Sequence, residues 1–158
     1  MSQMTNLVVK DDAATPKEYT FIPVTDTPFP QWRTNEANLP LEGQLRYSVQ
    51  MVPVKDGYKL TSKLEVPVME TVGSSGSSSG YIAPPKVAHV VTDINTMFCS
   101  KRATLNDRIN TKRMHMGILQ GAGATTGGGV LTNTAVGGGW TASAAAIVSF
   151  FRDLITPN

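Results

Sequence analysis

Strict alternation of apolar and polar residues runs through residues 45–52 and 58–68, which flank the tetrapeptide Val54-Lys-Asp-Gly57. A period of two is typical of a β-strand with one buried face, and an Asp-Gly pair between two such runs predicts a tight hairpin. We expect Asp56 and Gly57 to supply the positive φ that such a turn requires. This pattern constrains the chain to a fold built around an antiparallel sheet.

The two predicted strands of this hairpin divide their side chains in the same way. On the first strand, Arg46, Ser48 and Gln50 share one face, and Leu45, Tyr47, Val49 and Met51 share the other. On the second, Lys59, Thr61, Lys63 and Glu65 alternate with Leu60, Ser62, Leu64 and Val66. The sheet should therefore present a polar face backed by an apolar one. A slip of one residue in the first strand would exchange its two sets.

Further strands are predicted on both sides of this hairpin. Residues 6–10 and 18–24 predict an N-terminal hairpin around DDAATP. A stretch broken by prolines follows, where we expect the sheet ladder to be interrupted and Trp32 to anchor a core or an interface. Residues 86–100 predict a last long strand, with one side formed by Ala88, Val90, Ile94 and Phe98 and the other by His89, Asp93 and Asn95.

Two helices are predicted after the strands. Thr104-Leu-Asn-Asp107 has the form of a capping box and opens a helix from about Leu105 to Gln120. A second helix should begin at Trp140 and stop at Thr156-Pro157. Residues 121–139 form a Gly-rich connection between them, with 130–136 as a candidate short strand, and the Ser/Gly-rich residues 73–85 predict a flexible loop between strands.

Composition narrows the possible functions. The 158 residues suit one domain, and a net charge of +2 means that any nucleic-acid contact must come from local patterning. The apolar segment 144–151 is too short for a bilayer span. The single cysteine, Cys99, reads as a buried thiol, and the two histidines lie on different elements. We therefore expect no enzyme, no cofactor, no metal site and no membrane partner.

The predicted fold class is α+β, with an antiparallel sheet followed by two C-terminal helices. Such helices can cover the apolar face of their own sheet. They can also cross onto the sheet of a dimer partner, while the two sheets join edge to edge. The residue pattern alone leaves both arrangements open.

Residues 59–73, KLTSKLEVPVMETVG, resemble the strand and loop entry of the coat proteins of small single-stranded RNA bacteriophages, the levivirus type. The order of elements is similar too: an N-terminal hairpin, a tryptophan near position 32, paired long strands, a loop ending in Pro-Lys-Val, a final strand and C-terminal helices. The Ser/Gly insert and the length of residues 121–139 depart from that family's pattern.

The resemblance implies a structural capsid protein that forms an interlocked homodimer and then an icosahedral shell. The helices would cover the partner's sheet, and residues 73–85 would lie at the symmetry axes. The protein would assemble in the bacterial host cytoplasm and reside in the virion. Its partners would be the phage's single-stranded RNA genome, an RNA hairpin that acts as a translational operator, and a maturation protein.

The resemblance also implies an RNA-binding face on the inside of the shell. Thr61 and Lys63 fall at the positions of the family's RNA-contacting strand residues, and Arg46, Ser48 and Gln50 would share that face. His89 and Asp93 are weaker candidates, whose ring and carboxylate could contact an unpaired base. The competing interpretations are a solvated sheet face and a cellular domain that binds single-stranded nucleic acid, for which more aromatic residues would be expected.

Overall fold

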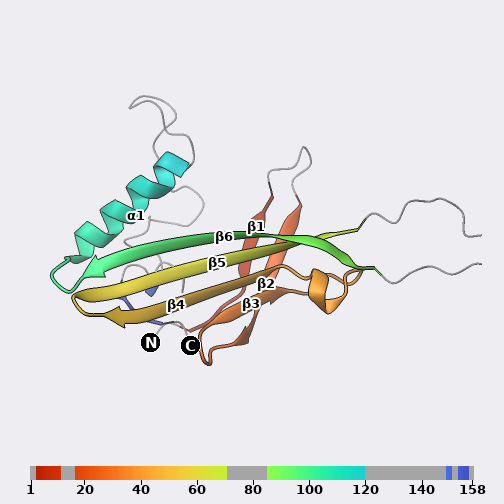
Figure 1. Cartoon of the computed structure of the whole chain (residues 1–158), viewed down its shortest axis with the longest axis horizontal. Coiled ribbons are helices and arrows are strands. Elements are labelled where there is room, and N and C mark those ends of the chain that lie inside the picture. The colour runs from red at the N-terminus through yellow and green to blue at the C-terminus, as the bar shows by residue number, and fades with distance from the viewer. Residues whose placement is uncertain (1–2, 12–16, 71–84, 120–148, 151–152, 157–158) are drawn as a thin grey trace, which may run out of the picture. The chain divides into compact units, whose positions relative to one another are not determined.

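The computed structural model describes residues 3–11, 17–70, 85–119, 149–150 and 153–156 (Figure 1). Six strands form one sheet in their order along the chain. They are β1 (Leu7–Lys10), β2 (Glu18–Thr25), β3 (Gln31–Thr34), β4 (Arg46–Val54), β5 (Gly57–Met69) and β6 (Val87–Ser100). A short 3-10 turn, η1 (Leu41–Gly43), precedes β4, and the helix α1 (Leu105–Leu119) follows β6. The predicted strand pairs and the first predicted helix are confirmed within one or two residues.

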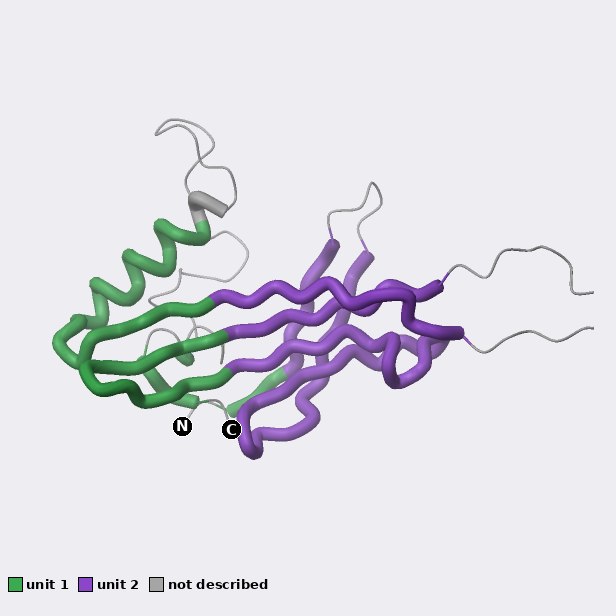
Figure 2. Tube along the Cα trace, viewed as in Figure 1, with its two compact units in different colours: residues 1–5, 50–61, 96–158 green, residues 6–49, 62–95 purple. Residues whose placement is uncertain are grey.

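The chain divides into two compact units (Figure 2). Unit 1 comprises residues 1–5, 50–61 and 96–158, and unit 2 comprises residues 6–49 and 62–95. The buried side chains of unit 2 include Phe21, Trp32 and Val49, and those of unit 1 include Leu60, Cys99, Ile109 and Phe150. Trp32 is 1% exposed, so it serves as a core anchor, and Cys99 is the buried free thiol that was expected.

The proline-broken stretch contains a strand that the sequence reasoning missed. After Pro30, the four residues of β3 pair with β2 on one side and with β4 on the other. The prolines precede the strand instead of interrupting it, so no ladder hydrogen bond is lost inside β3. The sheet therefore continues through β3, which joins the N-terminal hairpin to the long strands, although the ladder between β2 and β3 shifts register between Pro23 and Thr25.

A buried polar network fixes the connection between β3 and β4. Thr34 Oγ1 donates a hydrogen bond to Gln44 Oε1 at 3.0 Å and accepts one from the Leu45 amide at 3.0 Å. The Gln44 side-chain amide donates to the carbonyls of Glu36 and Leu39, each at 2.9 Å. Because buried polar groups are costly unless they are satisfied, this network specifies one path for the connection and hence one register for β3 against β4.

Gly57 is required at the β4–β5 turn for a different reason from the one predicted. Lys55 and Asp56 form a two-residue turn, and neither Asp56 nor Gly57 has the positive φ that was expected. A Cβ at Gly57 would instead lie 2.8 Å from the Cys99 carbonyl carbon and 3.0 Å from Ser100 Cα. The glycine is needed because the backbone of β6 passes too close for any side chain.

The other end of the β5–β6 pair is closed at Glu70 and Lys86. The Glu70 amide donates to the Lys86 carbonyl at 2.8 Å, and the two side chains form an ion pair at 3.9 Å.

Several predicted elements lie outside the described residues. They are residues 71–84, which comprise most of the predicted loop, and residues 121–139. Most of the second predicted helix lies outside them too, and Ser149, Phe150 and Asp153 are its described helical residues. No helix in the described ranges has the length and apolar character needed to cross a membrane.

The predicted capping box of α1 is confirmed. The Asp107 amide donates to Thr104 Oγ1 at 3.2 Å, and the Thr104 amide donates to Asp107 Oδ2 at 2.9 Å. The hydrogen bond from the Thr104 backbone lowers the pKa of the Asp107 carboxyl, and the one with the Thr104 side chain adds to the effect. Two amides that the helix leaves unpaired at its start are thereby satisfied.

We expect Thr104→Ala to lower the free energy of unfolding by about 1 kcal/mol at neutral pH, because the first turn loses its cap.

Asp107→Ala should also destabilise the protein, but only where the carboxylate is charged. Since the pKa is depressed in the folded state, this contribution is present above the ordinary pKa of 3.8 and disappears as pH falls through the folded value. Urea midpoints at pH 7 and pH 3 measure both effects. The exposed neighbour Asn106, changed to Ala, is the control. If Asp107→Ala lost as much unfolding free energy at pH 3 as at pH 7, the stated direction of the pKa shift would be contradicted.

Candidate nucleic-acid interface

The polar face of β4 and β5 is set by the two-residue turn and by one buried contact on the opposite face. Tyr47 and Ser62 share a side-chain hydrogen bond, so they lie on the same side of the sheet. Burial raises the pKa of the Tyr47 hydroxyl. Alternation then places the neighbouring residues Arg46, Ser48, Thr61 and Lys63 on the other side. The structure therefore supports the register in which Arg46 and Ser48, and not Tyr47 and Val49, accompany Lys63.

The same alternation assigns the remaining predicted residues of these two strands. Gln50 is exposed and follows Ser48 on β4, and Thr61 precedes Lys63 on β5. Within unit 1, Thr61 Oγ1 lies 3.5 Å from Thr96 Oγ1 on β6. The predicted set on β4 and β5 thus consists of hydroxyl, amide and cationic groups on one face, which is the chemistry that contacts phosphates and unpaired bases.

Lys63 is held by an ion pair within its own strand. Its Nζ lies 2.8 Å from Glu65 Oε1, two residues along β5 on the same face, and both side chains are partly exposed. An exposed pair of this kind contributes little to stability. A phosphate that approached Lys63 would have to compete with a carboxylate already in place.

The strand β3 adds two polar residues that the sequence reasoning missed. Gln31 lies directly opposite Ser48, and Arg33 lies directly opposite Arg46, so all four share one face. On the reverse side Trp32 lies opposite Tyr47, with ring centroids 6.0 Å apart. The signal was present in the sequence: a tryptophan buried in a strand requires that its two neighbours point the other way. The prolines on either side favour an interruption of the sheet, and for this reason the pattern alone does not predict β3.

The contacts described for β6 place other residues of this strand on the polar face, and the roles of His89 and Asp93 stay a prediction. The Thr61–Thr96 contact and the position of Lys59 Nζ, 5.9 Å from the Phe98 ring centre, put Thr96 and Phe98 on the face of Thr61. Regular alternation from Thr96 would put Asp93, whose charge raises the pKa of Tyr47, on the other side of the sheet. The Glu70–Lys86 backbone bond is one residue out of phase with the Lys101–Asp56 bond, so this alternation does not extend to His89.

Phe98, from the predicted apolar set of β6, consequently lies on the polar side of the sheet. Val90, Ile94 and Phe98 are between 48% and 71% exposed. Polarity alone could not reveal this reversal, because both sides of an edge strand in an isolated subunit are accessible to solvent.

The family model for the levivirus coat protein matches residues 2–137. The chain belongs to the levivirus coat protein family. This coat protein is 30% identical to the capsid protein of Pseudomonas phage PRR1 over 112 residues, which cover 69% of this chain and 79% of that protein. It is a phage capsid protein and a component of the virion, and its role is structural, not enzymatic.

Solved structures of other phages agree with this assignment. The virus-like particle of bacteriophage EMS014 has a subunit 40% identical to this coat protein, with a TM-score of 0.71 over 98% of this chain and 99% of that one. The capsid protein of bacteriophage GA is 20% identical, with a TM-score of 0.53 over 75% of this chain and 86% of that one, and shows the same fold. The six-stranded sheet with a C-terminal helix is therefore the coat-protein fold.

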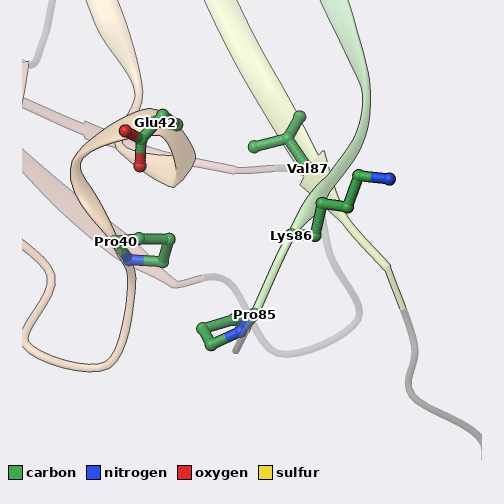
Figure 3. Close-up of a pocket in the computed structure, with 5 residues that line it drawn as sticks. All are labelled: Pro40, Glu42, Pro85, Lys86 and Val87. Carbon is green, nitrogen blue, oxygen red and sulfur yellow. The ribbon is translucent and has the colours of Figure 1, made fainter. Parts of the chain in front are cut away.

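A separate hollow of about 260 Å³ lies in unit 2 of the coat protein, beside η1 and the start of β6 (Figure 3). It is lined by Pro40, Glu42, Pro85, Lys86 and Val87. The Lys86 ammonium extends away from the two prolines (Figure 3). It pairs with Glu70 at 3.9 Å, so the hollow offers the two proline rings, Val87 and one carboxylate.

Proposed function

We propose that this coat protein forms a homodimer through the free edge of β6, assembles into an icosahedral shell, and binds RNA on the face that carries Thr61 and Lys63. The observation that carries the proposal is the combination, in a levivirus coat protein, of a long edge strand with a polar face on β3, β4 and β5. The virus-like particle of EMS014 supports the assembly part.

The dimer edge follows from the position of β6 in the sheet. It is the last of the described strands in the sheet order, so only one of its sides is paired within the described residues, and it is 14 residues long. A long, exposed, apolar edge is an aggregation hazard unless another strand covers it. A second copy of β6 would satisfy the open edge and extend the sheet across a two-fold axis.

The helix α1 is proposed to contribute to the same dimer. Leu105 and Met114 are 42% and 62% exposed, although Ile109 is buried within unit 1. When a partner covers apolar side chains that a helix leaves exposed, their removal from water stabilises the complex. We propose that α1 and the second predicted helix cross onto the partner's sheet, on the side opposite the RNA-binding face.

RNA binding is proposed for the side of the sheet that faces the inside of the shell. Lysine and arginine neutralise phosphates, and hydroxyl and amide groups hydrogen-bond to the backbone or to unpaired bases. Dimerisation doubles the face, so the net charge of +2 on each chain does not prevent binding. The ligands would be the phage genome and a hairpin within it, and a maturation protein would complete the virion.

The experiment begins with expression of the full chain alone and negative-stain microscopy of the product, followed by sequencing of the RNA extracted from any particles. Closed shells that contain RNA would support the proposal. A persistent monomer or dimer without shells would contradict assembly, and shells empty of RNA would contradict RNA binding.

Lys63 and Glu65 offer a matched pair for testing the RNA-binding face. With an RNA hairpin selected on the parental protein from a randomised-loop library, Lys63→Ala should weaken binding about tenfold, in line with a charge-assisted phosphate contact. Glu65→Gln should tighten it several-fold, because Lys63 loses its competing carboxylate. Filter binding measures both affinities, and microscopy checks that particles still form. Unchanged affinity in Lys63→Ala would remove Lys63 from the interface.

A further inference from the structure

Two arginines face each other at the junction of β3 and β4. Arg33 and Arg46 are direct cross-strand partners. The ladder bonds on either side, from the Thr34 amide to the Leu45 carbonyl at 3.0 Å and from the Val49 amide to the Pro30 carbonyl at 3.1 Å, identify them as a non-hydrogen-bonded pair. In such pairs the Cα atoms approach to about 4.5 Å, which is the closest spacing that an antiparallel sheet provides.

Such a pair is unfavourable unless an anion lies near it, since like charges directly opposite on a sheet repel. Among the ion pairs of the described residues, none includes Arg33 or Arg46. The two-residue turn places Glu65 of β5 across from Arg46, but its carboxylate is bound to Lys63 at 2.8 Å. Both guanidinium groups therefore remain available to an external anion.

The surroundings of the two arginines suit a phosphate group. The next pair along the strands, Gln31 and Ser48, adds an amide and a hydroxyl on the same face. Guanidinium groups bind phosphate oxygens in a bidentate manner, and two of them can converge on one phosphate. Short polar neighbours can then hydrogen-bond to the adjacent sugar or to a second oxygen.

The backbone beneath the pair is rigidly held. Trp32 is buried directly under Arg33 and packs against Tyr47, and the network of Thr34 and Gln44 fixes the register at the end of β3. A site whose backbone is already ordered loses little conformational entropy when it binds.

We propose that Arg33 and Arg46 together bind one backbone phosphate of the RNA, so that the RNA-binding face extends from β4 and β5 onto β3. This inference rests on the proposed function and adds to it a residue, Arg33, that neither the sequence pattern nor the family resemblance assigned. The pair supplies affinity and orientation without reading sequence, since it contacts the backbone.

The test compares Arg33→Gln, Arg46→Gln and the double variant in hairpin binding over a range of NaCl concentrations. Each single variant should bind about three- to tenfold more weakly and should lower the slope of log K against log salt by about 0.7 to 0.9, the value for one phosphate. The double variant should lose little more than one single variant, because both arginines share that phosphate. Lys55→Gln, which removes an exposed charge in the turn at the other end of β4, should bind like the parent.

A second measurement makes no use of RNA. At matched ionic strength, tripolyphosphate should raise the Tm of the parental protein more than that of Arg33→Gln, while without the anion Arg33→Gln should be at least as stable because the repulsion is relieved. If the parent binds RNA and Arg33→Gln matches it in both measurements, the inference is wrong and the proposed function stands. If the parent binds no RNA at all, the proposed function fails, whereas a tripolyphosphate effect lost in Arg33→Gln would still support the arginine pair as a phosphate site.

Discussion

Ile94→Pro should stop assembly before the dimer forms, so that neither dimers nor particles are recovered. The hydrogen bond from the Lys101 amide to the Asp56 carbonyl, 3.0 Å long, sets the phase of the ladder between β5 and β6. Counting back by twos from this end of β6, the odd-numbered residues bond to β5 as far as the Thr61–Thr96 pair, and the amide of Ile94, two residues further, is expected to point to the free edge. Proline at this position removes one donor from the proposed dimer edge and places a ring there.

The subunit itself should tolerate this change. Proline is accommodated on an edge strand where its missing amide faces away from the neighbouring strand. Ile94 is 58% exposed, so little core packing is lost. Ile94→Ala is the matched control, because it removes the side chain and keeps the amide, and it should still form particles.

Size-exclusion chromatography and negative-stain microscopy measure the outcome, and circular dichroism checks the secondary structure. Particles formed by Ile94→Pro at the parental yield would exclude the β6 edge as the dimer junction. Loss of particles in Ile94→Ala as well would assign the effect to the side chain instead of the edge.

Gly57→Ala should cost about 3 kcal/mol of unfolding free energy, near the upper end of what overpacking costs. The added Cβ would meet the backbone of β6 at Cys99 and Ser100, at 2.8 and 3.0 Å. Backbone atoms in a paired strand cannot move aside without breaking the ladder. Either β6 must shift at its end or the β4–β5 turn must open, and both disturb the connection that leads into α1.

Gly43→Ala provides a control with the same chemistry and a different neighbour. There the added Cβ would lie 2.7 Å from Met69 Sδ, in a flexible side chain that can rotate away. We expect a cost of about 1 kcal/mol or less. Urea unfolding at one fixed protein concentration, under reducing conditions because of Cys99, compares the two variants. Equal costs would show that the backbone contact at Gly57 is not the reason for that glycine.

The long hairpin was predictable because alternation, turn length and strand polarity all agree there. Its polar set on β4 and β5 holds in the structure, and the helix α1 begins at the predicted capping box. These features depend on neighbours close in sequence, whose periodicity is visible without knowledge of the fold. Arg46, Ser48, Thr61 and Lys63 could be placed together for that reason.

Two features depend on strand pairing that the sequence does not display. The face of β6 depends on its pairing with β5 across residues 70–86. The polarity of His89 and Asp93 favours the polar face, whereas the contacts of β6 put Thr96 and Phe98 there, so the place of the two polar residues stays a prediction. Arg33 was overlooked because prolines mark the boundaries of a strand as well as its absence, and pairing on both sides decides between these meanings.

The junction at Glu70 and Lys86 bears on how coat proteins of this kind can diverge. The main-chain bond and the ion pair complete the pairing of β5 with β6 before the Ser/Gly-rich residues begin. We therefore expect the register at Glu70 and Lys86 to be kept when the length or composition of residues 71–84 changes. Coat-protein genes could then vary this segment independently of the strands that flank it.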